Sequence, residues 1–502
     1  MPIAIHTQPG RARPTVDGVI AALAARPGPV VLDSADSQPG RGRFTIAAFE
    51  PVRVRLWHTG GEDPFTGLGD ELRATSGPLA WQTTPVPPAA RVFSGGWVGY
   101  FAYEAGRFIE TLPATTADDV ALPLARFALY DSAAVHDART GDWTLVAADL
   151  PRAVARGVAR PSPAERLAAW QALLADAERK TPVIPPPPPP ELPRHNMTRS
   201  CYERMVQRAI AHIAAGDIFQ VNLARRESFP VREPPATTYL RLRQTNPAAY
   251  AAFLQWDEVP ATAPDGVAAR GASRRCAILS SSPELFLHVR DGRVLTRPIK
   301  GTRPRSSDSA VDAAQRAELA ASAKDRAELA MIVDLERNDL GRVCRYGSVR
   351  VVVPPDSPAA PFALESHPTV HHLVADVAGE LSCGFDVIDL LRACFPGGSI
   401  TGAPKVRAME IIDALEPTVR SLYTGSIGYV GLDGAATFNI AIRTLIAAGE
   451  RIHLYAGGGI VADSRPADEY EETVAKALGM RWALDGAGVV IPDPCATNRE
   501  VP

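Results

Sequence analysis

The stretch HLYAGGGIVADSRPADEYEETVAKAL, residues 453–478, joins an apolar run, three consecutive glycines and an acidic periodic segment. The run from His453 to Ala456 predicts a strand, and the segment from Asp468 to Leu478 predicts a helix. The glycines at 457–459 predict a turn between the two, with backbone amides bare of side chains that can converge on an anion. An ordinary turn without a ligand is the alternative. We expect this strand, the glycines and the helix to form the closing unit of the chain.

Strand and helix patterns continue upstream from this stretch to about residue 198. Strands are expected at 219–223, 277–279, 285–289, 293–296, 348–353 and 371–377, and as a hairpin at 426–430 with 436–441. Helices are expected at 200–215, with a cap near Thr198 or Ser200, and at 310–335, 386–394 and 403–414. Residues 258–275, rich in alanine, glycine, proline and arginine, are expected to form a surface insertion.

An unbroken proline run extends from Pro185 to Pro190 and favours an extended polyproline II conformation. It predicts a semi-rigid linker at 181–197 between an N-terminal α+β lobe at 1–180 and a catalytic domain at 198–482, with a C-terminal tail at 483–502. A proline-rich ligand for a recognition domain is the alternative. The N-terminal lobe is expected to alternate short strands, such as 30–32 and 53–57, with glycine and proline turns, and to end in a helix at about 164–177.

The composition is that of a globular enzyme. With 502 residues, 46% of them hydrophobic, the chain is expected to form two domains or one large interleaved domain. A net charge of −3 provides no global basic field for nucleic acid or an anionic membrane. The six cysteines are scattered without a CxxC pair, which is typical of reduced thiols. No secretory or membrane-spanning segment is found, so we expect a cytoplasmic protein.

Two pairs of acidic residues are spaced i, i+3: Asp325 with Glu328, and Glu469 with Glu472. This spacing places both carboxylates of a pair on one face of a helix. If the two helices face each other, they can hold Mg²⁺, which prefers a few carboxylates together with water and a substrate oxygen. Solvated helix faces are the alternative.

Two further residues can bind or transform an anionic substrate. Lys300, in the segment RPIKGTR at 297–303, can act as a nucleophile if its amine is uncharged, and a solvated surface lysine is the alternative. Arg443 is expected on the strand before the glycines, where its guanidinium can bind a carboxylate with two hydrogen bonds. The glycine amides and Arg443 together predict a ligand with more than one carboxylate.

Acid and base candidates lie on neighbouring strands. Glu284 begins a strand with apolar neighbours, so its carboxyl can be desolvated and stay protonated near neutral pH. It is therefore a candidate general acid, with an exposed glutamate at a strand end as the alternative. For His371 and His372 the spacing does not separate a catalytic from a structural role.

With these residues, the chain resembles the chorismate-utilising family, the synthases that make anthranilate, aminodeoxychorismate, isochorismate and salicylate. The match is dense over about 198–480 and weaker over the N-terminal lobe. The segments that carry it are 216–223, 282–284, 297–302, 331–342, 372–374, 395–405 and 457–476. The implied fold is α+β, a large two-lobed antiparallel β-sandwich flanked by helices.

The resemblance also implies roles for individual residues. Glu328 and Glu472 would ligate Mg²⁺, with Asp325 and Glu469 as their outer partners. The substrate carboxylates would be held by Arg443, Tyr423 and the amides of Gly458 and Gly459. The other implied substrate-binding residues are His372 and Thr302 along the ring, Gln220 where hydrolysing relatives keep a lysine base, Thr401 and Lys405. Glu284 would protonate the departing C4 hydroxyl. Leu329, where many relatives have histidine, and the short Asp325 depart from the family pattern.

Position 300 separates two branches of the family, because anthranilate-forming members carry alanine there and aminodeoxychorismate-forming members carry lysine. The implied route is attack of the Lys300 amine on C2 with loss of the C4 hydroxyl, followed by attack of ammonia at C4 and expulsion of the lysine. This requires burial to lower the lysine pKa from about 10.4. The chain has no Gly-x-Cys-x-Gly turn, so a separate glutamine amidotransferase is the implied ammonia source.

Two other readings remain open. One is anthranilate formation, and the other is a chorismate-binding regulatory subunit without turnover. In the N-terminal lobe, Leu32-Asp33-Ser34 followed by Arg43-Phe44 resembles the tryptophan pocket of relatives, with plain β-structure as the alternative.

Overall fold

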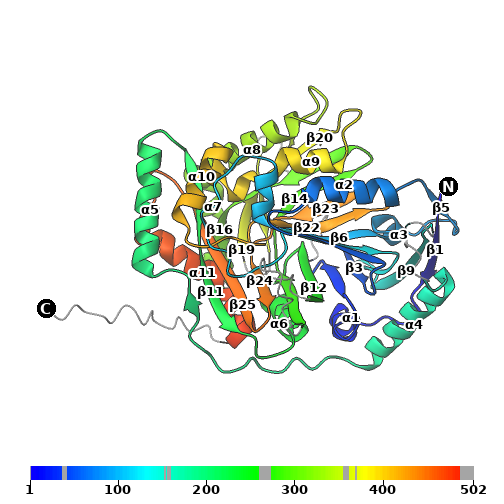
Figure 1. Cartoon of the computed structure of the whole chain (residues 1–502). Coiled ribbons are helices and arrows are strands. Elements are labelled where there is room, and N and C mark those ends of the chain that lie inside the picture. The colour runs from blue at the N-terminus through cyan, green and yellow to red at the C-terminus, as the bar shows by residue number, and fades with distance from the viewer. Residues whose placement is uncertain are drawn as a thin grey trace.

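A computed structural model describes residues 2–36, 42–151, 154, 160–258, 273–353, 361–367 and 370–486. Within these residues two large sheets form the centre of the molecule and helices cover them (Figure 1). The predicted insertion at 258–275 lies almost entirely outside the described residues, as does most of the predicted tail at 483–502.

The larger sheet has 13 strands and is antiparallel except where β1 pairs with β5. Its order is β10 (Arg194–His195), β11 (Gln220–Pro230), β25 (Arg451–Ile460), β24 (Thr444–Ala448), β13 (Arg274–Ser280), β12 (Ala251–Glu258), β2 (Val30–Asp33), β3 (Phe44–Ala48), β8 (Ser132–Asp137), β9 (Asp142–Asp149), β1 (Ile3–Pro9) and β5 (Leu79–Trp81), with β21 (Gly402–Ala403) beside β11.

A second, nine-stranded sheet is antiparallel throughout. Its order is β17 (Arg350–Val352), β20 (Asp376–Glu380), β15 (Arg293–Arg297), β14 (Leu285–Arg290), β23 (Ala436–Asn439), β22 (Ser426–Gly431), β6 (Gly96–Phe101), β7 (Ala125–Tyr130) and β4 (Arg53–Trp57). A small third sheet contains β16 (Ile299–Pro304), β19 (Val370–Val374) and β18 (Ala363–Ser366).

The two large sheets pack face to face. One cluster of buried apolar side chains contains Tyr100 and Tyr429 from the nine-stranded sheet together with Leu254, Ile278 and Ile446 from the larger sheet. Apolar faces buried in this way remove hydrocarbon from water and hold the layers together. The predicted α+β antiparallel sandwich is confirmed.

Both large sheets contain strands from either side of the proline-rich segment. In the larger sheet β2 pairs with β12, and in the nine-stranded sheet β6 pairs with β22. The proline-rich segment itself lies against the C-terminal half of the chain, where Arg241 donates to the Pro185 carbonyl and Arg232 to the Pro189 carbonyl, at 3.2 and 2.8 Å. The lobes predicted from the sequence therefore interleave through shared sheets.

Helices flank the sheets on several sides. They are α1 (Val16–Leu23), α2 (Pro64–Thr75), α3 (Pro88–Val92), α4 (Pro163–Arg179), α5 (Arg199–Ala214), α6 (Pro235–Thr245), α7 (Ser309–Ala321), α8 (Ala323–Gly341), α9 (Val387–Cys394), α10 (Lys405–Leu415) and α11 (Pro466–Asp485), with short 3-10 turns η1 (Tyr103–Phe108) and η2 (Gly398–Ile400). In Figure 1, α5 and α11 lie beside β11 and β25 at the left, and α8 and α9 lie at the top. As predicted, Thr198 caps α5 by accepting from the Cys201 amide. No helix in the described ranges is long and apolar enough to cross a membrane.

Three local predictions were wrong. The segment 310–335 is two helices, because Ser322 leaves the helical conformation and accepts from the Asp325 amide, which caps α8. The segment 371–377 divides between β19 and β20, which belong to different sheets. The glycines at 457–459 lie inside β25, paired with residues 222–224 of β11, and do not form a turn.

Candidate active site

A cavity of about 250 Å³ opens where β16 and β19 meet the ends of β11, β24 and β25, between α8 and α11. The predicted site residues that line it are Glu284, Lys300, Thr302, Asp325, Glu328, His372, Tyr423, Arg443, Gly459, Glu469 and Glu472. These residues are far apart in the sequence, and the fold brings the elements that carry them together around one cavity.

Lys300 enters the cavity from β16. Its Nζ donates a hydrogen bond to the Ser399 carbonyl at 3.1 Å. Burial lowers the pKa of Lys300, although the carboxylates of Glu328 and Glu284 oppose this shift. The next residue, Gly301, has φ +71°, and a Cβ there would lie 2.7 Å from Leu319, so the strand can pass α7 only with glycine at this position. The sequence thus places a lysine whose charge is disfavoured at the cavity wall.

Glu284 lies directly before β14 and is only 4% exposed. Burial raises its pKa to about 7, although the neighbouring Ser399, Lys300 and Arg443 favour the ionised form. A carboxyl with this pKa is protonated in a large share of molecules at neutral pH. It can therefore donate a proton to a leaving oxygen.

Arg443 does not lie on a strand, contrary to the prediction. It precedes β24 in the left-handed region, with φ 48°, and its carbonyl accepts from the Ser281 amide at 3.0 Å. Burial lowers the pKa of its guanidinium, and Glu284 partly offsets this. A buried cation at the cavity wall suits a carboxylate ligand.

The acidic side chains of α8 and α11 face the same cavity. They contact Arg303 (from Asp325, 3.1 Å), Lys324 (from Glu328, 3.9 Å), Lys476 (from Glu472, 2.7 Å) and the Ser464 hydroxyl (from Glu469, 2.6 Å). Burial raises the pKa of Glu328. For Glu472 burial acts in the same direction, but Lys476 and other cations outweigh it and the pKa is lowered. Two carboxylate-bearing helices therefore meet at one end of the cavity, which is the arrangement on which the predicted Mg²⁺ site depends.

The glycines of β25 leave room for the site. A Cβ on Gly458 would lie 3.1 Å from Glu469 Oε2, and a Cβ on Gly457 would lie 2.9 Å from the Tyr423 hydroxyl. A Cβ on Gly459 would overlap the Gln220 amide. Side chains at these positions would displace the groups that surround the cavity.

The remaining predicted residues differ in position. Gln220 lies on β11 beside Gly459, behind the cavity wall. Thr401 and Lys405 do not line the cavity: Thr401 donates to the Gly397 carbonyl, and Lys405 forms an ion pair with Asp339. Their contacts stabilise the segment between α9 and α10. Both residues belong to the segment 395–405 that resembles the family, although neither lines the cavity.

The structure also separates the two histidines. His372 Nδ1 lies 3.1 Å from the Thr302 hydroxyl at the cavity. His371 faces the other side of β19, where it contacts Asp312 and Ser366 at 3.2 and 2.8 Å. Successive strand residues point to opposite faces, so only one of the two can line the site.

The family model for chorismate binding enzymes matches residues 37–481. The chain belongs to the chorismate-binding enzyme family. It is 40% identical over 461 residues to aminodeoxychorismate synthase component 1 of Klebsiella aerogenes, covering 90% of this chain and 93% of that protein. It is 38% identical over 465 residues to anthranilate synthase component 1 of Streptomyces coelicolor, covering 90% and 83%. Among solved structures, anthranilate synthase component I of Streptococcus pneumoniae matches with a TM-score of 0.69 and 28% identity, covering 89% of this chain and 93% of that one.

The acidic side chains at the cavity of this chorismate-binding enzyme could supply part of the ligand shell of Mg²⁺. No group of three or more His, Cys, Asp or Glu side chains in the described residues converges closely enough to hold a metal ion by itself. Mg²⁺, however, commonly takes one or two carboxylates and completes its shell with water and substrate oxygens. Glu328 and Glu472 could serve as these ligands, because both line the cavity and the charge of Glu472 contributes to the raised pKa of Glu328. Leu329, the departure from the family pattern, is buried in the core and does not line the cavity.

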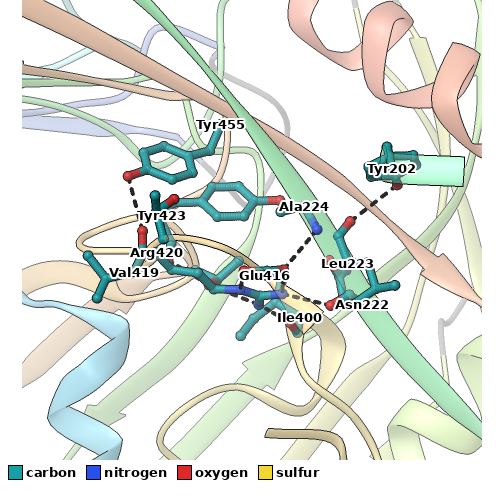
Figure 2. Close-up of polar contacts among 12 residues, drawn as sticks. Tyr202, Asn222, Leu223, Ala224, Ile400, Glu416, Val419, Arg420, Tyr423 and Tyr455 are labelled. Atoms are coloured by element: carbon teal, nitrogen blue, oxygen red, sulfur yellow. Dashed lines mark hydrogen bonds and ion pairs between the residues drawn. The ribbon is translucent and has the colours of Figure 1, made fainter. Parts of the chain in front are cut away.

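A buried network behind the cavity was missed by the sequence analysis. Arg420 and Glu416, four residues apart in a loop after α10, form an ion pair at 2.6 Å, and both are almost fully buried (Figure 2). The stacked rings of Tyr423 and Tyr455 lie beside them, with centroids 5.3 Å apart. The sequence shows that Glu416 and Arg420 are four residues apart. This spacing predicts a contact only within a helix, and these residues lie in a loop.

A second cavity, of about 660 Å³, lies between the two large sheets. Its lining includes the segment Leu32-Asp33-Ser34 with Arg43 and Phe44, the residues whose pattern resembles a tryptophan pocket. The pattern therefore marks a real cavity, while binding of tryptophan in it stays a prediction.

Proposed function

We propose that this chain is the synthase component that converts chorismate and ammonia to 4-amino-4-deoxychorismate, on the route to 4-aminobenzoate and folate. The observation that carries this proposal is the Lys300 amine, held in the cavity at 3.1 Å from the Ser399 carbonyl, in the same cavity as the buried acid Glu284. Relatives from several bacteria that bear the name aminodeoxychorismate synthase component 1 support it.

The residues present suggest a balanced two-step route. In the first step the neutral Lys300 amine forms a bond to C2, the two conjugated ring double bonds shift toward C4, and the C4–O bond breaks while Glu284 donates a proton, so that the oxygen leaves as water. In the second step ammonia forms a bond to C4, the two double bonds shift back, and the bond between Lys300 and C2 breaks. The proton lost by the added nitrogen returns to Glu284, and both residues recover their starting states.

Other residues would orient the substrate. The guanidinium of Arg443 and the amides of Gly458 and Gly459 would hold one carboxylate, with Tyr423 beside them, and His372 and Thr302 would contact the ring. Mg²⁺ held by Glu328 and Glu472 would neutralise a second carboxylate, with Asp325 and Glu469 supporting the ligands. Gln220 carries no basic group, so it would not activate water as a nucleophile. Thr401 and Lys405 would support this wall from outside the cavity.

Ammonia would come from a separate glutamine amidotransferase. The relatives carry the designation component 1 in their names, and this chain contains no Gly-x-Cys-x-Gly nucleophile turn of the kind that glutaminases use. The proposed complex therefore pairs this chain with a glutamine-hydrolysing subunit.

The test uses the purified chain with chorismate, Mg²⁺ and ammonium salt, and the product is analysed by mass spectrometry. Formation of an aminated product that keeps the enolpyruvyl group supports the proposal. Anthranilate, which has lost that group, would instead support the second candidate, which the 38% identity to the Streptomyces coelicolor anthranilate synthase component favours. Chorismate binding without any product would support a regulatory subunit.

A further inference from the structure

Arg420 is a buried cation that binds three separate segments of the cavity wall, and none of the proposed steps uses it. It is 1% exposed. Its guanidinium donates to the Asn222 carbonyl of β11 at 2.6 Å and to the Ile400 carbonyl of η2 at 3.1 Å (Figure 2). Asn222, Ile400 and Tyr423, whose ring lies 5.9 Å from the guanidinium, all line the cavity.

Glu416 holds Arg420 in one orientation. Its carboxylate accepts from Arg420 Nε at 2.9 Å and from Nη2 at 2.6 Å. The same carboxylate accepts from the Ala224 amide at 2.9 Å, so the ion pair is attached to β11 through both partners. From the other side, the Arg420 amide donates to Glu104 of η1 at 2.8 Å. The guanidinium therefore has little freedom to rotate.

The contact with Ile400 leads directly to Lys300. Ile400 follows Ser399 in η2, and the Ser399 carbonyl accepts the hydrogen bond from Lys300 Nζ. Arg420 binds the peptide carbonyl immediately after this acceptor and ties it to β11. The position of the Ser399 carbonyl, and hence of the amine, depends on this attachment.

A buried ion pair is costly to desolvate and often adds little net stability compared with apolar side chains of similar size. The geometry that the pair imposes on the cavity wall is thus a better explanation for its place beside the cavity. We propose that Arg420, fixed by Glu416, is a positioning residue that holds the Ser399–Ile400 turn and thereby aims the Lys300 amine at the substrate. This inference rests on the proposed function, because the nucleophilic role of Lys300 is part of that proposal.

The test compares Arg420→Lys with Arg241→Lys. Arg241 is a matched control because it is also buried and paired with a glutamate, Glu233, but it binds the carbonyls of Ala483 and Pro185, away from the cavity. We expect Arg420→Lys to lower kcat for amination by about 10- to 100-fold, because a small displacement of a reacting group has this effect. The KM for chorismate should change by less than about twofold, since the carboxylate-binding groups remain.

Arg241→Lys should lower the thermal unfolding midpoint as much as Arg420→Lys does, without this loss of kcat. Equal kcat values for the two variants would overturn the inference. If Arg420→Lys does not fold, Glu416→Gln replaces it, with the same expected split between kcat and KM, and an unchanged kcat in that variant would likewise overturn the inference.

A second readout does not depend on turnover. In a crystal structure of Arg420→Lys we expect Lys300 Nζ to lie beyond about 3.5 Å from the Ser399 carbonyl, outside hydrogen-bond reach. If the bond persists there as in the wild-type chain, Arg420 does not position the amine. Failure of the wild-type chain to aminate chorismate would instead refute the proposed function, and the two results are distinguishable.

Discussion

At the scale of single residues, one cavity favours a deprotonated amine at Lys300 and a protonated carboxyl at Glu284. Burial lowers the pKa of the lysine and raises that of the glutamate to about 7. Burial disfavours the charged form of each group, so both tend toward neutrality. A neutral amine and a neutral carboxylic acid are the forms that nucleophilic attack and proton donation require.

The pH dependence of amination should follow from these shifts. Glu284 must be protonated to donate, so we expect kcat/KM to fall as pH rises through about 7. Lys300 must be uncharged, so activity should fall again at low pH, below its lowered pKa. The measurement is a pH profile of kcat/KM with ammonia held in excess. Glu104 is a second buried carboxyl with a pKa of about 7, but it does not line the cavity. The Glu104→Gln variant should therefore show the same fall in kcat/KM above about pH 7. A profile that stays flat above neutrality would exclude Glu284 as the acid.

Lys300→Ala should abolish the formation of aminodeoxychorismate and leave the fold intact. The substitution removes the amine from a cavity and not from the apolar core, so we expect a loss of at least about 10³-fold in kcat and an unchanged unfolding temperature. Lys300→Arg is the informative companion, because it places a permanent positive charge there but has no nucleophilic amine. It should be equally inactive in the product assay. Substantial amination by the arginine variant would show that charge at this position is sufficient.

Much of the cavity lining could be predicted from residue types, and the reasons for the failures are physical. Lys300, Glu284 and Arg443 stand out because charged side chains are seldom buried without a purpose. Arg420 could not be recognised, since its importance lies in backbone carbonyls that it binds and that no sequence pattern displays. Lys405 was placed at the cavity only through its segment, while its side chain pairs with Asp339 elsewhere.

At the scale of elements, α8 and α11 bring Glu328 and Glu472 to one end of the cavity. If these carboxylates hold Mg²⁺, Glu328→Gln should raise the Mg²⁺ concentration needed for half-maximal activity by about tenfold or more, because one charged ligand is lost. The measurement is a magnesium titration of amination. Glu471→Gln on α11 is the control, since Glu471 is exposed and pairs with Arg199. If both variants titrate like the wild-type chain, Glu328 is not a ligand.

A buried carboxylate of β11 helps to attach α11. Glu227 pairs with Arg225 at 2.6 Å and with Arg481 of α11 at 3.1 Å. Glu227→Ala would leave two buried guanidinium groups without their carboxylate, which costs about 3–5 kcal/mol. Thermal unfolding should therefore occur at a clearly lower temperature. Glu203→Ala, which breaks the more exposed pair with Arg199, should cost only about 0–1 kcal/mol. Equal unfolding temperatures for the two variants would contradict this account.

Most strands and helices could be predicted from periodicity, and the errors lie where tertiary contacts override local signals. Glycines 457–459 predict a turn, but they continue β25 because small residues are needed beside Gln220, Tyr423 and Glu469. The break at Ser322 was readable in principle, since a serine three residues before Asp325 is a capping pattern. The division between β19 and β20 could not be seen, because residues 371–377 contain no glycine or proline break and yet supply strands to two sheets.

At the scale of the whole molecule, the shared sheets make a definite prediction about the two lobes. If residues 1–180 and 198–502 are produced separately, we expect neither to unfold cooperatively on heating, because each would lack partner strands in both large sheets. Circular dichroism melting curves of each piece and of their mixture provide the measurement. A cooperative transition in the isolated N-terminal piece would show that it is an independent domain.

The sequence could not indicate this sharing. The proline run at 185–190 has the composition of a linker, and composition reports stiffness but not which strands pair across it. The pairing of β2 with β12 and of β6 with β22 depends on side chains distant in sequence, to which local patterns are blind.

The pairing of β6 with β22 has a consequence for biosynthesis. Gly99 and Gly428 are neighbours in the sheet, yet roughly 330 residues of chain separate them. At about 5–20 residues per second, the ribosome needs tens of seconds to supply the partner of β6. During that interval the nascent chain presents an apolar strand edge to the solvent. Productive folding must therefore wait for nearly complete translation, and a chaperone that shields the edge would raise the yield.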